Sequence, residues 1–154
     1  MGDGGVSEGY GAARLSDGSY VTTGYGAATG EGKESSFGYA STLAPDLVSF
    51  KLTDGKFNAG YGTDGRLAIQ SEGKGQPTAE DRGRDVVALP DDRTVHIGRF
   101  GGNAAAFVVT ADGQLDTDQG DHGVIKLGHP AIDAQLFSAA INAATKAITM
   151  TSTL

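Results

Sequence analysis

The sequence has no cysteine and no tryptophan, only 4 prolines, and few aromatic residues, which make up 7% of the chain. Without cysteine there are no disulfides, thiol nucleophiles or thiolate metal sites. No apolar run approaches the roughly 18 residues that a membrane-spanning helix needs, so membrane insertion is not expected. The start of the chain has neither the basic nor the apolar segment of a signal peptide. A secreted protein whose signal had been removed would look the same.

Positive charge is also scarce. The chain has 12 Lys and Arg residues against 19 Asp and Glu residues, and its net charge is -7. This balance argues against binding to nucleic-acid phosphates and against docking on anionic membranes. Glycine, in contrast, is abundant at 25 of 154 residues, about twice the usual share. The length and composition fit one domain, or two very small ones, with a lean core and many turns.

Two kinds of hairpin each occur more than once. The first type spans residues 15–24, which read as a strand, a tight acidic turn, a strand and a glycine, and it recurs at residues 89–98. The second type spans residues 54–69 and recurs at residues 112–127 with the same glycine spacing. The order of the two types is the same in both copies, so the sequence predicts a repeat of two hairpins.

The turn residues support this prediction. Asp-Gly pairs between apolar or β-branched flanks are typical of type I′ turns, in which both central residues have positive φ. We expect such turns at Asp17-Gly18, Asp54-Gly55 and Asp112-Gly113, with Asp91-Asp92 as a weaker version.

Residues 131–148 allow two interpretations. Leu136 and Ala140 lie at helical spacing in an alanine-rich segment, and Pro130 is suited to a helix start, so local propensity favours a helix. Alignment with residues 81–89 instead favours a third hairpin of the first type, with Ala139 placed on Val87. We favour the hairpin, in which alanines replace the acidic turn.

A family resemblance rests on the second copy. Residues 87–98 follow the first half, and residues 107–124 the second half, of a pattern that resembles the delta-sixty type bacterial repeat. Members of that family are thought to form β-propeller blades. The resemblance therefore implies an all-β fold of antiparallel four-stranded blades, a partial or split β-propeller of about two and a half repeats. The family motif carries no catalytic residues, so it implies no enzymatic activity.

The expected organisation of the chain follows from the repeats. In chain order the segments are a flexible N-terminus at residues 1–11, a first blade-like repeat at 12–70 with a glycine-rich insertion near 27–45, a linker at 71–83, a second repeat at 84–127, and half of a third repeat, or a C-terminal helix, at 128–154.

One acidic segment resembles a metal site. Asp116, Asp118 and Asp121 alternate with other residues and are interleaved with glycine, as the hard oxygen donors of a calcium loop are. The position of the bidentate glutamate of EF-hand loops is taken by Leu127, however, and Asp116 could instead cap a turn through its own backbone. Asp116, Asp118 and Asp121 are the candidate metal ligands, and the candidate metal is calcium. The sequence predicts no other cofactor and no catalytic residue.

Two further groups of residues stand out in the sequence. The three histidines are expected to be surface or turn residues and not zinc ligands. Five aromatic–glycine steps are interpreted as strand-end packing, with a sugar-binding rim as the alternative: Tyr10-Gly11, Tyr25-Gly26, Phe37-Gly38, Tyr61-Gly62 and Phe100-Gly101.

The sequence therefore favours a non-enzymatic structural or binding module, extracytoplasmic (secreted or periplasmic) and completed by further blades from another chain or a longer parent. A protein partner is expected, because the third repeat is only half present. The alternatives are a calcium-dependent or carbohydrate-binding module, and a non-catalytic subunit or fragment of a larger enzyme. Nucleic acid is not an expected partner, and the sequence specifies no ligand.

Overall fold

The structure, a computed structural model, describes residues 8–26, 46–69, 81–101, 103–127, 135–142 and 144–153. These residues form strands and turns and contain no helix, so the all-β prediction is confirmed. The predicted insertion near residues 27–45 and most of the linker lie outside the described residues. The strands are β1 (Glu8–Arg14), β2 (Tyr20–Gly26), β3 (Asp46–Thr53), β4 (Lys56–Phe57), β5 (Arg66–Ile69), β6 (Arg82–Ala88), β7 (Thr94–Phe100), β8 (Asn103–Val109), β9 (Val124–Lys126), β10 (Gln135–Ile141) and β11 (Ile148–Thr153).

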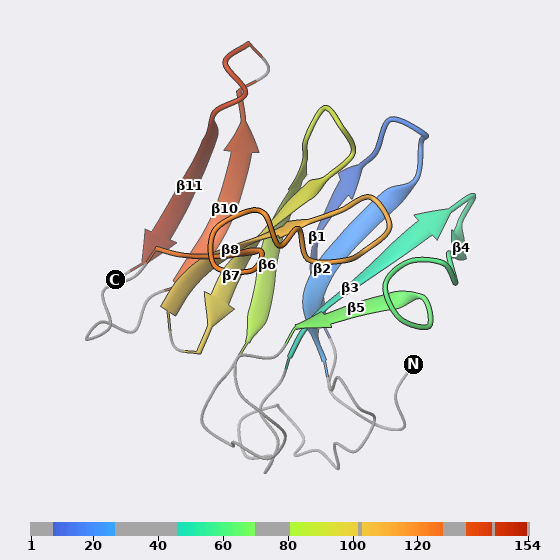
Figure 1. Cartoon of the computed structure of the whole chain (residues 1–154), viewed down its shortest axis with the longest axis horizontal. Coiled ribbons are helices and arrows are strands. Elements are labelled where there is room, and N and C mark those ends of the chain that lie inside the picture. Colours follow the sequence, from blue (N-terminus) through green and yellow to red (C-terminus); the bar gives the residue numbers. More distant parts are fainter. Residues whose placement is uncertain are drawn as a thin grey trace.

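The strands form three antiparallel sheets, one for each repeat. The first repeat has the order β1-β2-β3-β4, with β5 also paired to β3, and the second has the order β6-β7-β8-β9. The third sheet is the hairpin β10–β11 alone, which we call the third hairpin. Figure 1 shows the hairpins β1–β2, β6–β7 and β10–β11 side by side. The described strands do not close a barrel.

The three first-type hairpins share one irregularity. The pairing register shifts between Gly9 and Gly11 in β1, and between Gly83 and Asp85 in β6. It shifts in β10 as well, between Leu136 and Ser138. Each shift leaves one extra residue unpaired, which is a β-bulge. The common bulge establishes β10–β11 as a first-type hairpin. The helical alternative for residues 131–148 is therefore wrong for the residues of this segment that the structure describes, 135–142 and 144–148.

The bulges also correct the alignment of the third hairpin. They make Ser138 equivalent to Asp85, and hence Ala139 equivalent to Val86 and not to Val87. A one-residue slip moves each side chain to the opposite face of the sheet. In this register Ala139 and Met150 pack against the second repeat, and this burial overrides the helix propensity of the alanine-rich segment.

Most of the acidic turns are longer than predicted. Among the four predicted turns, only Asp54-Gly55 has positive φ at both central residues, 51° and 73°, as a type I′ turn requires. In the hairpin of β1 and β2, Leu15 N donates to Ser19 O over 2.8 Å, which leaves a three-residue loop with Gly18 alone at positive φ. The turns that end at Asp92 and Gly113 have the same form. The type I′ prediction is therefore wrong for Asp17-Gly18, Asp91-Asp92 and Asp112-Gly113. A type I turn followed by one left-handed residue joins these strands equally well.

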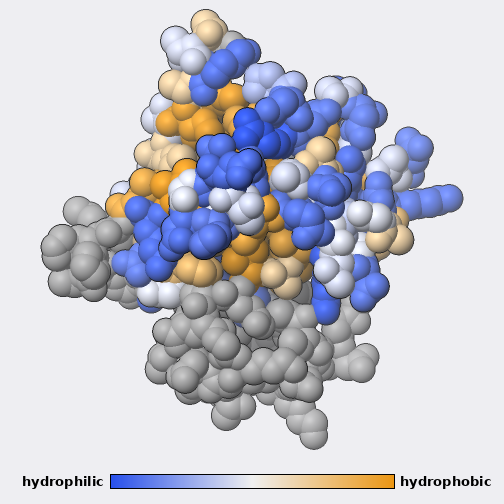
Figure 2. All heavy atoms as spheres, in the orientation of Figure 1, coloured by the Kyte–Doolittle hydropathy of each residue, from blue (hydrophilic) through white to orange (hydrophobic). Residues whose placement is uncertain are grey.

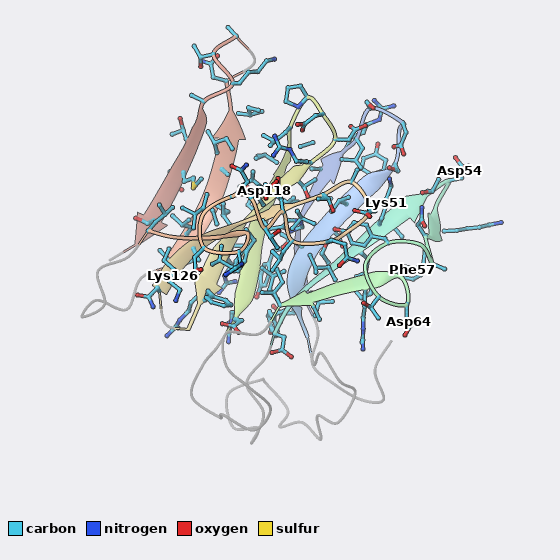
Figure 3. The ribbon with its side chains drawn as sticks, viewed as in Figure 1. Lys51, Asp54, Phe57, Asp64, Asp118 and Lys126 are labelled. Atoms are coloured by element: carbon cyan, nitrogen blue, oxygen red, sulfur yellow. The ribbon has the colours of Figure 1, made fainter. Side chains whose placement is uncertain are left out.

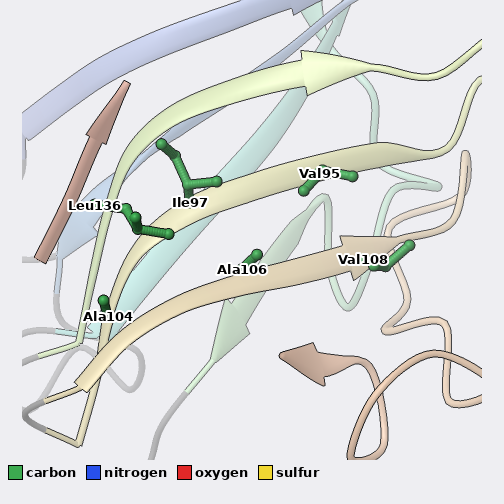
Figure 4. Packing of buried hydrophobic residues seen from close by; sticks show 6 residues of the cluster. All are labelled: Val95, Ile97, Ala104, Ala106, Val108 and Leu136. Atoms are coloured by element: carbon green, nitrogen blue, oxygen red, sulfur yellow. The ribbon is translucent and has the colours of Figure 1, made fainter. Parts of the chain in front are cut away.

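Strand β8 lies at the centre of the core. Its even-numbered residues, Ala104, Ala106 and Val108, pack with Val95, Ile97 and Leu136 on the side of the third hairpin (Figure 4). Its odd-numbered residues, Ala105, Phe107 and Val109, pack with Leu47 and Ile69 of the first repeat. Because successive residues point to opposite faces of a strand, the unbroken apolar run of β8 is buried on both sides.

The repeats begin earlier than expected. Strand β1 starts at Glu8, inside the segment predicted to be a flexible N-terminus, because residues 8–14 pair with β2. Strand β6 likewise starts at Arg82, inside the predicted linker. In both places glycine-rich sequence suggested a loop, whereas the glycines belong to the bulged start of a strand.

Candidate functional site

The extra residues of the three bulges form the most distinctive side-chain cluster of the molecule. They are Tyr10 in β1, Arg84 in β6 and Phe137 in β10. The Arg84 Cζ atom lies 4.4 Å from the centroid of the Tyr10 ring and 5.4 Å from that of the Phe137 ring. Both distances are within the range of cation–π attraction. We call this row, which runs across all three repeats, the bulge ladder.

Two further residues lie next to the ladder, on the side of Tyr10. The Tyr25 ring lies 5.8 Å from the Tyr10 ring, centroid to centroid, and Arg82 Cζ lies 4.8 Å from the Tyr25 centroid. Tyr25 and Arg82 are buried, whereas Tyr10 is 40% exposed and Phe137 is 43% exposed. The two ends of the ladder are thus the parts that solvent reaches.

Glu8 supplies the negative charge beside the ladder. The Tyr10 hydroxyl donates a hydrogen bond to Glu8 Oε2. This bond, together with the nearby Arg82 and Arg84, lowers the pKa of Glu8. Burial raises the pKa of Tyr10, and burial with the nearby Glu8 charge raises the pKa of Tyr25 to about 12. At neutral pH the cluster therefore holds one carboxylate, two guanidinium groups and two neutral phenols.

Asp85, the residue after the bulge in β6, joins the strands that carry the ladder. Its Oδ2 atom accepts hydrogen bonds from Ser138 Oγ at 3.2 Å and Ala139 N at 3.0 Å. On the other side Gly11 lies so close that a Cβ there would be 3.0 Å from Asp85. The first strands of the three repeats therefore meet at Asp85, which fixes the spacing of the ladder.

Only part of this cluster is recognisable in the sequence. Tyr10 and Tyr25 both belong to aromatic–glycine steps, and the structure brings these two together. Tyr61 lies elsewhere, buried with its hydroxyl 2.9 Å from Ser49 Oγ, and burial raises its pKa to about 12. Phe100 packs against Phe107, and Phe37 lies outside the described residues. Arg84, Asp85 and Phe137 were missed, and the signal that identifies them is their shared position at the bulge.

The candidate calcium loop is organised around an ion pair. Arg93 Nη1 donates to Asp116 Oδ2 at 2.7 Å, and Asp118 N donates to Asp116 Oδ1 at 3.3 Å. Asp121 starts a tight turn in which its N–H donates to Val124 O. Figure 3 shows Asp118 on the loop in front of the second repeat. No group of three or more His, Cys, Asp or Glu side chains that could hold a metal ion occurs in the described part of the chain, and the calcium site stays a prediction.

Replacing Asp116 with asparagine is expected to lower the free energy of unfolding by about 1 kcal/mol, because the ion pair with Arg93 is partly shielded from solvent. Asp118→Asn is the matched control and should have little effect, since its backbone N–H makes the bond to Asp116. Urea unfolding with and without calcium distinguishes a structural role of Asp116 in the ion pair from a role as a calcium ligand. A calcium-dependent stabilisation that both variants abolish would contradict the structural role and support the metal site.

The histidines differ from their predicted placement. His122 is exposed in a turn, as expected, and His129 lies outside the described residues. His96, however, is fully buried in β7, where its Nε2 atom lies 3.0 Å from Thr94 Oγ1. Burial lowers the pKa of His96 to about 3, so it is neutral at physiological pH. Its ring fills the interior between sheets, which excludes it from contact with a substrate.

Two findings bear on the class of protein. No helix in the described residues is long and apolar enough to cross a membrane. Comparison of the chain with protein-family models, curated proteins and solved structures gives no match.

Proposed function

We propose that this chain is a non-enzymatic structural and binding module of propeller-type blades, in which β11 is completed by a second-type hairpin of a further repeat. One observation carries the proposal. In the first two repeats the second strand is paired on both sides, β2 with β1 and β3, and β7 with β6 and β8. The equivalent strand of the third hairpin, β11, is paired only with β10 among the described strands.

The open side of β11 favours an added strand. An edge strand presents a row of unpaired N–H and C=O groups, which natural proteins usually cover or protect with charge. The described residues of β10 and β11 include no charged side chain. The order of hairpins in the chain indicates the occupant, because a second-type hairpin follows the first-type hairpin in both complete repeats.

The chemistry of the bulge ladder agrees with a binding module. Its charged groups stack on aromatic rings or lie close to one another, and its two exposed aromatic ends can contact a partner surface. The repeats would thus act as a scaffold. The protein segment that they bind would be the hairpin that pairs with β11.

A chain extended after Leu154 by a short Gly-Ser linker and a copy of residues 103–127 tests this function. We expect hydrogen exchange at the β11 amides to slow by about tenfold or more, because the outward N–H groups gain acceptors. The control extension carries the same residues in scrambled order. Unchanged exchange with the native-order hairpin, or equal slowing with the scrambled one, would contradict the proposal.

A further inference from the structure

The first repeat has one sheet face that differs in burial from its counterpart in the second repeat. The repeat alignment makes Tyr20 equivalent to Thr94, Thr22 to His96 and Phe50 to Phe107. Thr94, His96 and Phe107 are at most 1% exposed, whereas Tyr20 is 46% exposed. Thr22 and Phe50 are also only partly buried. We call the face of Tyr20, Thr22 and Phe50 the front face.

The reason for this difference is the position of each face in the stack. Phe107 is covered by Leu47 and Ile69, which lie on the opposite face of the first repeat. The second repeat is likewise covered on its other side by the third hairpin. Each sheet thus presents one face to the preceding repeat and one to the following repeat. Among the described residues, no repeat covers the front face.

The other end of the stack is the outer face of the third hairpin. Ala139 and Met150 pack on the second repeat, so the alternating residues Ala140, Thr149 and Thr151 point away from it. These three side chains are small, uncharged and exposed. Val21 and Val95 occupy the position of Thr149 in the first two repeats, and both are buried. Val95 packs with Leu136 of the following repeat, and the cluster of Val21 includes Ala88 of the following repeat.

The bulge ladder is open at the same two ends. Arg84 of the second repeat lies between Tyr10 and Phe137, whereas Tyr10 and Phe137 each have a large exposed fraction. If one more repeat were stacked beyond the third hairpin, its bulge residue would lie next to Phe137. A second copy of the chain would provide Tyr10 in that position.

We infer that the outer face of the third hairpin binds the front face of a second copy of this chain, head to tail. The contact joins Ala140, Thr149 and Thr151 of one copy to Tyr20 and Thr22 of the next, and it places Phe137 beside Tyr10. Such an interface is heterologous, so it closes into a ring or continues as a filament. Phe50 in β3 and Phe57 in β4 have ring centroids 5.4 Å apart, and these strands have no counterpart in the third hairpin. The two rings are therefore left for the second-type hairpin of the proposed function.

Two variants test the contact, and each is designed to block one of the two faces that form it. Tyr20→Lys places a charge on the front face, and Thr149→Lys places one on the outer face of the third hairpin. Both positions are exposed, so both chains are expected to fold, which urea unfolding verifies. In sedimentation velocity the wild-type chain should form species of at least twice the monomer mass of 15.6 kDa, and each variant alone should be monomeric.

Mixing the two variants is the decisive experiment. Each variant keeps one intact face, so an equimolar mixture should form a dimer and nothing larger. In a Phe137→Trp chain, whose tryptophan is unique, the emission should shift to the blue as concentration rises. A monomeric wild-type chain at all concentrations would overturn the inference. So would a mixture that stays monomeric, or an association that only Tyr20→Lys prevents, which indicates a front-to-front dimer.

This inference rests on the proposed function, because both treat the repeats as blades that stack. The tests are separate, however. The mixing experiment uses chains without an added hairpin. Hydrogen exchange at β11 in the extended chain reports only whether the open edge of β11 is paired. Slower exchange at β11 together with a monomeric wild-type chain would overturn the head-to-tail contact alone. Unchanged exchange at β11 together with an associating wild-type chain would overturn the completed edge alone.

Discussion

Gly113→Val is expected to lower the free energy of unfolding by about 3–5 kcal/mol, through backbone strain and overpacking together. Gly113 has a φ of 85°, where a β-branched residue is strained. A Cβ at this position would also lie 2.6 Å from Gly62 N and 2.8 Å from the Tyr61 ring. Gly62 N donates to Asp112 O at 2.7 Å, so the two second-type hairpins touch here and neither can move away without losing this bond. Urea unfolding measures the loss.

Gly55→Val is the matched comparison. Gly55 occupies the equivalent turn of the first repeat, with a φ of 73°, but a Cβ there would meet nothing within 4 Å. Only the backbone strain remains, and the expected loss is about 1–3 kcal/mol. Gly30→Val, in the predicted insertion, should cost much less. Equal losses in the Gly113 and Gly55 variants would show that the contact with Tyr61 contributes nothing.

Acidification is expected to destabilise the protein before its carboxylates titrate. The pKa of His96 is lowered from 6.5 to about 3 by burial, so between these values the unfolded chain binds a proton that the folded chain does not. The stability contributed by neutral His96 is therefore complete above pH 6.5 and is lost as the pH falls towards 3. The loss approaches about 1.4 kcal/mol per pH unit, or roughly 2–3 kcal/mol between pH 6.5 and 4.5.

His96→Gln should flatten this slope, whereas His122→Asn, in the exposed turn, should leave it unchanged. The carboxylates act in a different window. Hydrogen bonds from Ser19 lower the pKa of Asp17 to about 2, so the stability that it contributes is lost only below its ordinary value of 3.8. Urea unfolding at a series of pH values measures the slope. If His96→Gln does not fold, an NMR titration of the wild-type imidazole decides, and protonation of the folded state near pH 6 would contradict the prediction.

The sequence was sufficient to predict the elements that have a local signal. Asp17, Asp54 and Asp112 each mark a turn, and the spacing of the glycines pairs the second-type hairpins correctly. Even the third hairpin was found without an acidic turn, because its apolar positions repeat. Its register was one residue in error, since the bulge at Phe137 adds a residue that an alternating pattern does not reveal.

The candidate site was less predictable for a physical reason. Tyr10, Arg84 and Phe137 lie far apart in the chain, and each is ordinary in its local sequence. They meet because three strands with equivalent bulges pack side by side, which is a tertiary relationship. His96 was misplaced for the same reason. A polar residue in a strand usually marks the solvent face, but here that face is covered by the first repeat.

The burial of β8 on both sides has a consequence for folding. Among the described strands, each sheet packs against its immediate neighbours, so the molecule behaves as a short one-dimensional array in which nearest-neighbour interfaces supply the cooperativity. The second sheet belongs to both interfaces, while each outer sheet belongs to one. Local unfolding should therefore start at the ends of the array, and we expect β10 and β11 to open at the lowest free energy. The amides of β8 should exchange only when the whole molecule unfolds.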